Sequence, residues 1–255
     1  MKGERSPKAE EDFTEQAYSQ LLALVLKHWV PVGFSRALEP DSNCLWRHDI
    51  DFSPQRAARL AELEADAGIT ATYFVHLHST FYNALEPDSL AAYRRILAGG
   101  HELGLHVDLE ALGPRDWTEE LAHAWIRREG EMLTQVAETK VRSISFHNPT
   151  EAGWLPRSDE VAGYVNAYGP TIQKRYRYCS DSNGRWRFDR LEDVLREGRV
   201  EPLHVLTHPC WWPAQPMAAR ARVERCIEGR AQRTLTTYVN ILSEAGRTDT
   251  PDPRA

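Results

Sequence analysis

The chain has 255 residues, of which 42% are hydrophobic and 27% charged, so it contains enough apolar side chains to bury a sizeable core. Its net charge of −6 argues against nucleic acid as a partner, because nucleic-acid binding requires clustered positive charge. No apolar run is long enough to cross a bilayer, and the charged N-terminal residues do not form a signal peptide. The four cysteines show no C-x-x-C spacing. We therefore expect a cytoplasmic globular protein, and its aromatic content would allow a homo-oligomer.

The two ends of the chain differ in composition from the rest. Residues 1–10 are charged and residues 247–255 are rich in Pro, Asp, Thr and Arg, so we expect flexible tails around a single domain at 11–246. Strand and helix are predicted to alternate along this domain, which favours parallel strands joined by crossover helices. The expected elements are an amphipathic helix at 13–29, a strand at 43–50, a helix from 54, a strand at 70–75, a helix at 88–98, a strand at 101–107, a helix at 117–137, a strand at 141–147, short strands near 163–168 and 176–180, a helix at 189–197, a strand at 202–207 and a helix at 216–244.

Two carboxylates lie at the end of the predicted strand at 43–50. Asp49 and Asp51 are two residues apart and project from the same face of an extended segment, whereas His48 projects from the other. Carboxylates held this close share a proton or a metal ion. The alternative is that one of them caps the helix that Ser53 and Pro54 begin. Because parallel α/β folds build active sites at the C-terminal ends of their strands, we expect an active site here.

Histidines lie at the ends of three further predicted strands. They are His106, His147 and His208. A single histidine at a strand end is usually a satisfied polar group, but three of them and a carboxylate pair would converge on one edge of a parallel sheet. Imidazole and carboxylate together favour a divalent metal, with zinc expected first and iron, cobalt or nickel as alternatives.

These motifs resemble those of the polysaccharide deacetylase superfamily, the NodB-homology carbohydrate esterases of the family 4 type. The resemblance covers residues 40–210. Residues 68–75 are similar to the family's G-x-x-A-T-F-F strand, residues 100–106 to its G-H-E-I-G-N-H strand, and residues 206–208 to its late L-L-H. The motifs R-H-D-x-D, G-L-H-x-D, S-F-H-x-P, S-D-S and H-P-x-W-W together are similar to an uncharacterised branch, whose members tend to sit among genes for surface-polysaccharide assembly. The resemblance implies an α/β fold, a distorted (β/α)7-type barrel in a single domain.

The chain departs from the family's pattern at two places. The family's aspartates are adjacent, the first a general base and the second a zinc ligand, whereas Ile50 separates Asp49 from Asp51 here. Which of the two is base and which is ligand therefore stays open. The family's second metal-binding histidine lies four residues after the first, where this chain has Glu110. We expect His147 to replace it, with Asp108, Glu110 or a metal-free site as alternatives.

The resemblance implies a hydrolase of amide bonds. Asp51, His106 and His147 would hold the metal. Asp49 would accept the proton of the attacking water, and His208 would protonate the departing amine. The expected reaction is removal of an N-acyl group, N-acetyl first, from a sugar or a sugar-linked precursor. The alternatives are hydrolysis of a small non-sugar amide and a non-catalytic barrel that binds carbohydrate.

Six residues around these strand ends are predicted to contact or orient the substrate. Arg47 could orient an aspartate by a bidentate pair, and Trp211 could stack on a sugar ring, although packing explains an aromatic pair as well. His78, Tyr82 and Asn83 could line a sugar subsite, with core packing or turn formation as the alternative. The segment at 180–184 is a predicted turn, in which the resemblance implies that Asp181 contacts the substrate or a catalytic histidine. The six are Arg47, His78, Tyr82, Asn83, Asp181 and Trp211.

Overall fold

The computed structural model describes residues 12–113, 116–148, 156–198 and 201–247. The tail expected at 1–10 lies outside them, as does the tail expected at 247–255 except for Arg247. The described helices are α1 (Glu15–Val25), α2 (Pro54–Asp66), α3 (Pro87–Ala98), α4 (Glu119–Val136), α5 (Pro170–Arg175), α6 (Leu191–Glu197) and α7 (Ala219–Glu244). The described strands are β1 (Pro31–Val32), β2 (Cys44–Ile50), β3 (Thr72–Val75), β4 (Glu102–Val107), β5 (Ser143–Phe146), β6 (Glu160–Val161), β7 (Tyr164–Asn166), β8 (Arg177–Ser180) and β9 (Leu203–Thr207).

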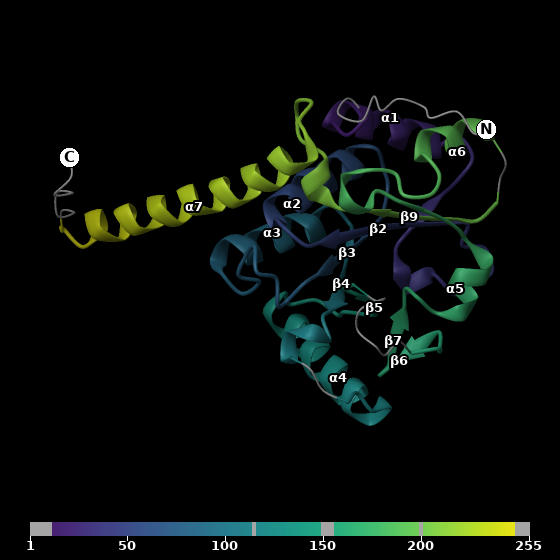
Figure 1. Ribbon diagram of the computed structural model, residues 1–255, viewed down its shortest axis with the longest axis horizontal. Helices are drawn as coiled ribbons and strands as arrows, with labels where there is room; N and C mark the ends of the chain where they lie inside the picture. The colour runs from purple at the N-terminus through teal and green to yellow at the C-terminus, as the bar shows by residue number, and fades with distance from the viewer. Residues whose placement is uncertain (1–11, 114–115, 149–155, 199–200, 248–255) are drawn as a thin grey trace.

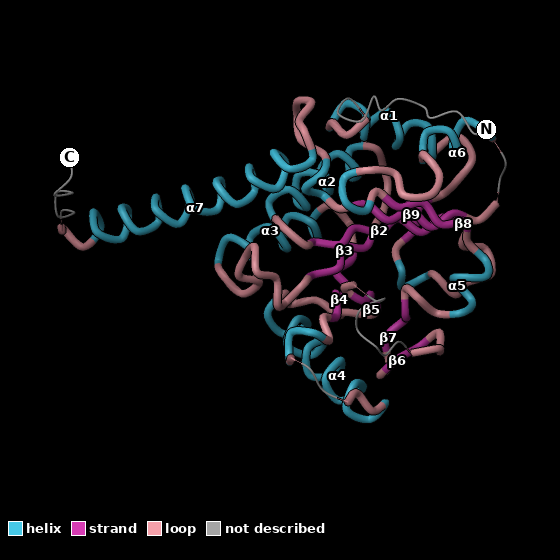
Figure 2. Tube along the Cα trace, viewed as in Figure 1, coloured by secondary structure: helices cyan, strands magenta, loops and turns pink. Residues whose placement is uncertain are grey.

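These strands form one curled sheet in the order β6-β7-β5-β4-β3-β2-β9-β8, with β1 added beside β2 (Figure 2). Within the described residues every pairing is parallel except β6 with β7. Helices α2, α3 and α4 link successive strands, as crossover connections of a parallel sheet require (Figure 1). The prediction of an α/β fold with parallel strands, of the distorted-barrel kind, is confirmed.

Strand β2 lies in the middle of this sheet, and all seven of its residues are buried. The helix after it begins as the sequence predicts. The hydroxyl of Ser53 accepts a hydrogen bond from the backbone N–H of Arg56, and Pro54 occupies the first turn. Ala57, Leu60 and other apolar residues on one side of α2 join the core. This strand–turn–helix unit holds the segment at 49–51 at the edge of the sheet.

The register of the strands aligns their C-terminal ends. Ile50 of β2 lies beside Val75 of β3, so the next residue on each strand, Asp51 and His76, leaves the sheet at the same level. His147 follows β5 on the same edge. Because all these strands run in one direction, their polar ends meet where the sheet stops.

Some elements differ from the expectation. The short helix α5 and the strand β1 were not predicted, because six and two residues are too few to show a period. The final helix begins at Ala219 rather than at 216. That helix extends away from the sheet and its covering helices (Figure 1). Among the described residues, no helix combines the length and the apolar character that a membrane span requires.

Candidate metal centre

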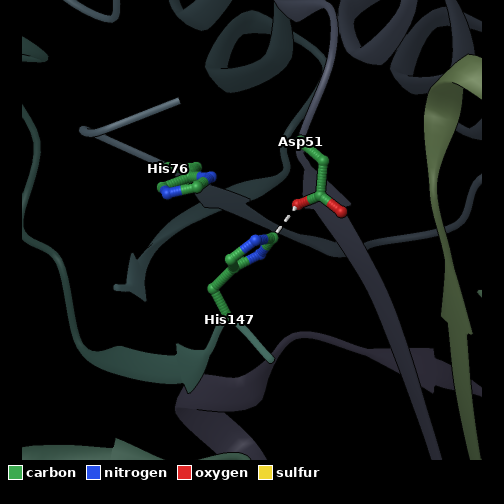
Figure 3. Close-up of side chains that lie close together, drawn as sticks. All are labelled: Asp51, His76 and His147. Atoms are coloured by element: carbon green, nitrogen blue, oxygen red, sulfur yellow. Dashed lines mark ion pairs between the residues drawn. The ribbon is translucent and has the colours of Figure 1, made fainter. Parts of the chain in front are cut away.

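Asp51, His76 and His147 meet at the C-terminal edge of the sheet, at the ends of β2, β3 and β5 (Figure 3). One potential ligand atom from each lies within 4.8 Å of the other two. Oδ1 of Asp51 is 3.8 Å from Nδ1 of His147. This Oδ1 is buried and accepts no hydrogen bond from any described residue. A buried carboxylate oxygen that accepts no hydrogen bond and faces imidazole rings fits a divalent cation.

Asp108 orients His76 toward this group. Nε2 of His76 lies 3.1 Å from Oδ2 of Asp108, while Oδ1 of Asp108 accepts hydrogen bonds from the backbone N–H groups of Glu110 and Ala111. Burial raises the pKa of Asp108, but His76 outweighs burial and brings the pKa to about 2. An ionised carboxylate only accepts, so Nε2 of His76 carries the hydrogen of this contact and Nδ1 is the nitrogen left to bind a metal. Of the two alternative ligands, Asp108 thus contacts a histidine of the group, whereas Glu110 is exposed and reaches Asp108 through its backbone N–H.

His106 lies next to the group, inside β4. Its Nε2 is 3.4 Å from Oδ1 of Asp51 and 3.3 Å from Nδ1 of His147, and its Nδ1 is 2.6 Å from Oγ of Ser145. The rings of His106 and His76 are farther apart, with centroids separated by 5.6 Å. The structure therefore brings the three ligands expected from the sequence together and adds a third histidine, His76, to them.

Asp49 is held by Arg47 rather than by a histidine. The guanidinium donates to both carboxylate oxygens, at 2.8 and 2.7 Å, and both side chains are buried. Burial raises the pKa of Asp49, but the charge and hydrogen bonds of Arg47, together with the nearby His106 and His208, lower the pKa below the ordinary value. The bidentate pair expected from the sequence is present. Arg47 itself is fully buried and is not among the residues that line the cavity, so its contact in this structure is with Asp49.

His208 approaches the group from β9, on the other side of β2. Its Nδ1 donates to Oδ1 of Asp181 at 2.6 Å, and its Nε2 lies 3.7 Å from Oδ2 of Asp51. Trp212 also donates to Asp181, which fixes this buried carboxylate. Burial lowers the pKa of His208, but Asp181 outweighs burial and raises the pKa to about 9. At neutral pH His208 is therefore a cation that can give up a proton.

A cavity of about 650 Å³ opens above these groups. One wall is aromatic, because the ring of Phe52 lies 4.4 Å from that of Phe81 and 5.7 Å from that of Trp211. His78 also lines the cavity, where Glu129 accepts its hydrogen bond and raises its pKa. The other lining residues include Ser79, Thr80, Asn148, Tyr168, Tyr178, Ser182, Asn183, Arg187 and Phe188.

Two residues predicted to line a sugar subsite are not among those that line the cavity. Tyr82 is buried, and its hydroxyl donates to the backbone oxygen of Ile50 at 2.7 Å while accepting from the N–H of His76. The side-chain oxygen of Asn83 accepts from the N–H of Leu85 in a turn. The two alternatives considered for these residues, core packing and turn formation, describe what is observed.

His76 was missed in the sequence although it carries the same signal as the other histidines. It directly follows the predicted strand at 70–75, as His147 and His208 follow theirs. Our interpretation passed over it in favour of His78. The rule that the first polar residue after a parallel strand faces the site would have found it.

No family model matches the sequence, and no curated protein matches it. Among solved structures, the chain is similar to a CE4 family pseudoenzyme from Bacillus anthracis, with a TM-score of 0.44, 12% identity and coverage of 77% of this chain and 63% of that one. It is also similar to a family 4 acetyl xylan esterase from Clostridium thermocellum in complex with a cobalt ion (TM-score 0.41, 13% identity, coverage 78% and 91%). A family 4 carbohydrate esterase from Bacillus anthracis gives a TM-score of 0.41 at 15% identity, with coverage of 92% and 88%.

The chain spans less than two thirds of the length of the first of these structures. At such identities and TM-scores the similarities assign no activity to this chain.

Proposed function

We propose that the chain is a metal-dependent hydrolase that removes an N-acyl group, N-acetyl in the simplest case, from a sugar or a sugar-linked precursor used in surface-polysaccharide assembly. The observation that carries this proposal is the group formed by Asp51, His76 and His147 on the floor of the cavity. One carboxylate and two imidazoles leave further coordination positions on a metal ion open for water and substrate. Such a donor set is typical of a catalytic rather than a structural metal site.

Asp51, His76 and His147 are the residues that would hold the ion, with His106 beside them. Once bound, a divalent ion polarises the acyl carbonyl and lowers the pKa of water. Asp108 would keep Nδ1 of His76 directed at the site through the hydrogen bond to Nε2. These side chains come from β2, β3, β4 and β5, so the sheet itself sets their separations.

Asp49 is the residue we assign as general base. Its carboxylate is ionised, and the bidentate contact with Arg47 fixes its orientation beside Asp51. Oδ1 of Asp51 accepts no hydrogen bond and is free to bind a metal, whereas both oxygens of Asp49 accept hydrogen bonds from Arg47. This difference supports Asp51 as the ligand, and each oxygen of Asp49 keeps a second lone pair with which Asp49 could accept a proton as the base.

His208 is the residue we assign as general acid. It is protonated at neutral pH because Asp181 accepts the hydrogen of Nδ1, which leaves Nε2 directed toward Asp51. A proton given by Nε2 to the departing amine would complete cleavage of the amide bond.

The shape of the cavity supports a sugar as the substrate. A volume of about 650 Å³ is larger than a small amide needs and lies in the range of ligand pockets. The rings of Phe52, Phe81 and Trp211 offer an apolar wall on which a pyranose face could stack.

Two measurements test the proposal. Elemental analysis of the purified chain should find one divalent transition metal per chain, and mass spectrometry should detect deacetylation of at least one N-acetylated sugar or sugar nucleotide. Asp49→Asn and His208→Ala should each lower the rate by about two to four powers of ten. His28→Ala, which replaces an exposed histidine outside the cavity, should leave the rate unchanged.

The outcomes separate the alternatives. A chain that binds metal but hydrolyses no amide, although it binds sugars, would overturn the enzymatic proposal in favour of a carbohydrate-binding protein. Activity confined to small amides without a sugar ring would overturn the assignment of a sugar as the substrate. It would not affect the assignment of the metal site.

A further inference from the structure

Building on the function proposed above, we infer that the sugar of the substrate carries an anionic oxygen group, a phosphate or a carboxylate, and that Arg187 binds this group at the wall of the cavity. Among the described residues that line the cavity, Arg187 has the one guanidinium or ammonium group. A cation in this place selects between charged and neutral substrates.

Arg187 forms no ion pair with any described residue. Its side chain is exposed, and its guanidinium carbon lies 5.5 Å from the centre of the ring of Phe188, which lines the cavity as well. Asp189, the nearest acidic residue in the sequence, pairs with Arg177 instead. A guanidinium beside a cavity-lining ring and without an acidic partner can bind two oxygens of a carboxylate or a phosphate at once.

The carboxylates that line the cavity interact with other groups. Asp49 is paired with Arg47, and Asp108 accepts hydrogen bonds from His76 and from backbone N–H groups. The charge of Asp51 would be balanced by the cation that it binds. None of these carboxylates therefore neutralises Arg187.

A hydrogen-bonded loop fixes the backbone of Arg187 relative to the site. The loop follows β8, which lies beside β9 at one end of the sheet (Figure 2). The backbone N–H of Arg187 donates to the oxygen of Ser180, and that of Gly184 to the oxygen of Asp181, both at 3.0 Å. Because the carboxylate of Asp181 accepts the hydrogen bond of His208, the same loop positions Arg187 and the proposed general acid.

Two further polar residues of this loop, Ser182 and Asn183, line the cavity. Oγ of Ser182 lies 2.6 Å from Oγ of Ser180, which ties the loop to the end of β8. Hydroxyl and amide groups are neutral hydrogen-bond donors. The wall that contains Arg187 thus also contains residues whose side chains can donate to the oxygens of an anionic group.

The position of Arg187 assigns the anionic group to the sugar rather than to the acyl group. The proposed acid His208 follows β9 and gives its proton to the amine, which stays on the sugar. Arg187 follows β8 on the same side of β2, whereas His76 and His147 follow β3 and β5 on the other side. A sugar whose nitrogen faces His208 can therefore reach Arg187 with an anionic substituent, in a cavity of about 650 Å³.

Isothermal titration calorimetry with hexosamines tests this. Glucosamine, galactosamine and mannosamine, their 1-phosphates and their uronic acids contain no amide bond, so their binding is measured without turnover. At least one anionic sugar should bind about tenfold more tightly than the neutral sugar of the same configuration, because Arg187 adds charge-assisted hydrogen bonds. The preference should decrease at high salt, since Arg187 is exposed. The 1-phosphates and the uronic acids distinguish a phosphate from a carboxylate.

Substitution of the arginine locates the anion. Arg187→Gln should abolish the preference for the anionic sugar, and Arg187→Lys should retain part of it, because the charge remains without the guanidinium fork. Arg185→Gln is the matched control, because Arg185 is an exposed arginine of the same loop that is not among the residues lining the cavity. This variant should keep the preference in full.

A panel in which no anionic sugar binds more tightly than its neutral counterpart would overturn the inference. A preference that survives Arg187→Gln would overturn it as well, since the anion would then bind elsewhere, for instance to the metal. Failure of the proposed function has a different outcome: anionic sugars would bind through Arg187, but no N-acetylated sugar would be hydrolysed.

Discussion

His76 and His78 are two residues apart and both line the cavity, yet their surroundings differ. Nε2 of His76 donates to Asp108, which leaves Nδ1 for the group formed with Asp51 and His147. His78 lies farther out, where it pairs with Glu129 and stacks on Trp125 at a ring-centroid distance of 5.7 Å. The partner of each imidazole therefore decides which of the two can bind a metal.

This difference predicts a contrast in metal affinity. His76→Ala should weaken binding of zinc or cobalt by more than about 100-fold, since a ligand is lost, and Asp108→Asn by about 10- to 100-fold, since only its orientation is lost. His78→Ala should leave the affinity unchanged. Competition with a chromophoric chelator measures all three affinities, and equal losses in His76→Ala and His78→Ala would contradict the assignment.

At the scale of the elements, the two faces of β2 contact different parts of the protein. Asp49 and Asp51 face the cavity, while His48 faces α2, where its Nε2 donates to Glu64 at 2.6 Å. Tyr73 donates to the other oxygen of Glu64 at 2.6 Å, and Thr207 lies 2.7 Å from Nδ1 of His48. This buried network ties α2, β2, β3 and β9 together directly behind the residues of the site.

Glu64→Gln should therefore lower the free energy of unfolding by about 1–3 kcal/mol at pH 7, because an amide nitrogen, which cannot accept, replaces one of the two carboxylate oxygens that accept buried hydrogen bonds. Glu62→Gln, on the exposed side of the same helix, removes only surface pairs with Arg59 and Arg95 and should cost less than about 1 kcal/mol. Denaturant unfolding of wild type and both variants measures the difference.

The effect of Glu64→Gln should depend on pH in one direction. Burial raises the pKa of Glu64, but His48 outweighs burial and lowers the pKa below the ordinary value of 4.5. The ionised carboxylate thus stabilises the folded state above pH 4.5, and this stabilisation is lost as the pH falls through the lowered pKa. The difference in the free energy of unfolding between wild type and Glu64→Gln should become smaller below pH 4.5. A difference that grows there would contradict this role of Glu64.

For the molecule as a whole, the candidate metal centre joins strands that are distant in sequence. Asp51 and His147 are separated by almost a hundred residues and three strands of the fold, so a metal bound to both would link parts of the chain that separate on unfolding. A ligand that binds only the folded state raises the free energy of unfolding by an amount set by its concentration and affinity.

Metal should accordingly raise the melting temperature. At about 100 times the dissociation constant the gain is about 2.7 kcal/mol, which corresponds to a shift of several degrees for a protein of this size. Chelation should reverse the shift, His76→Ala should abolish it and His78→Ala should retain it. A melting temperature that none of zinc, cobalt, nickel or iron changes would contradict the candidate metal centre.

Much of the site follows from local pattern. The alternation of strands and helices predicts a parallel sheet, and a parallel sheet brings the ends of its strands to one edge whatever the details of packing. Asp49, Asp51, His106, His147 and His208 could therefore be placed together from the sequence, and the bidentate pair of Arg47 with Asp49 follows from their separation of two along one strand.

Other features depend on which distant segments pack together, and only the tertiary structure decides them. Periodicity does not show that Asp108 turns His76 toward Asp51, that Tyr82 points into the core, or that Asp181 lies behind His208. It predicts α7 but not that its second half projects beyond the sheet. The sequence by itself determined which faces of each element are polar, because that depends on neighbouring residues. The partner of each polar group depends instead on the length and path of each loop, because these decide against which distant element the next helix or strand packs.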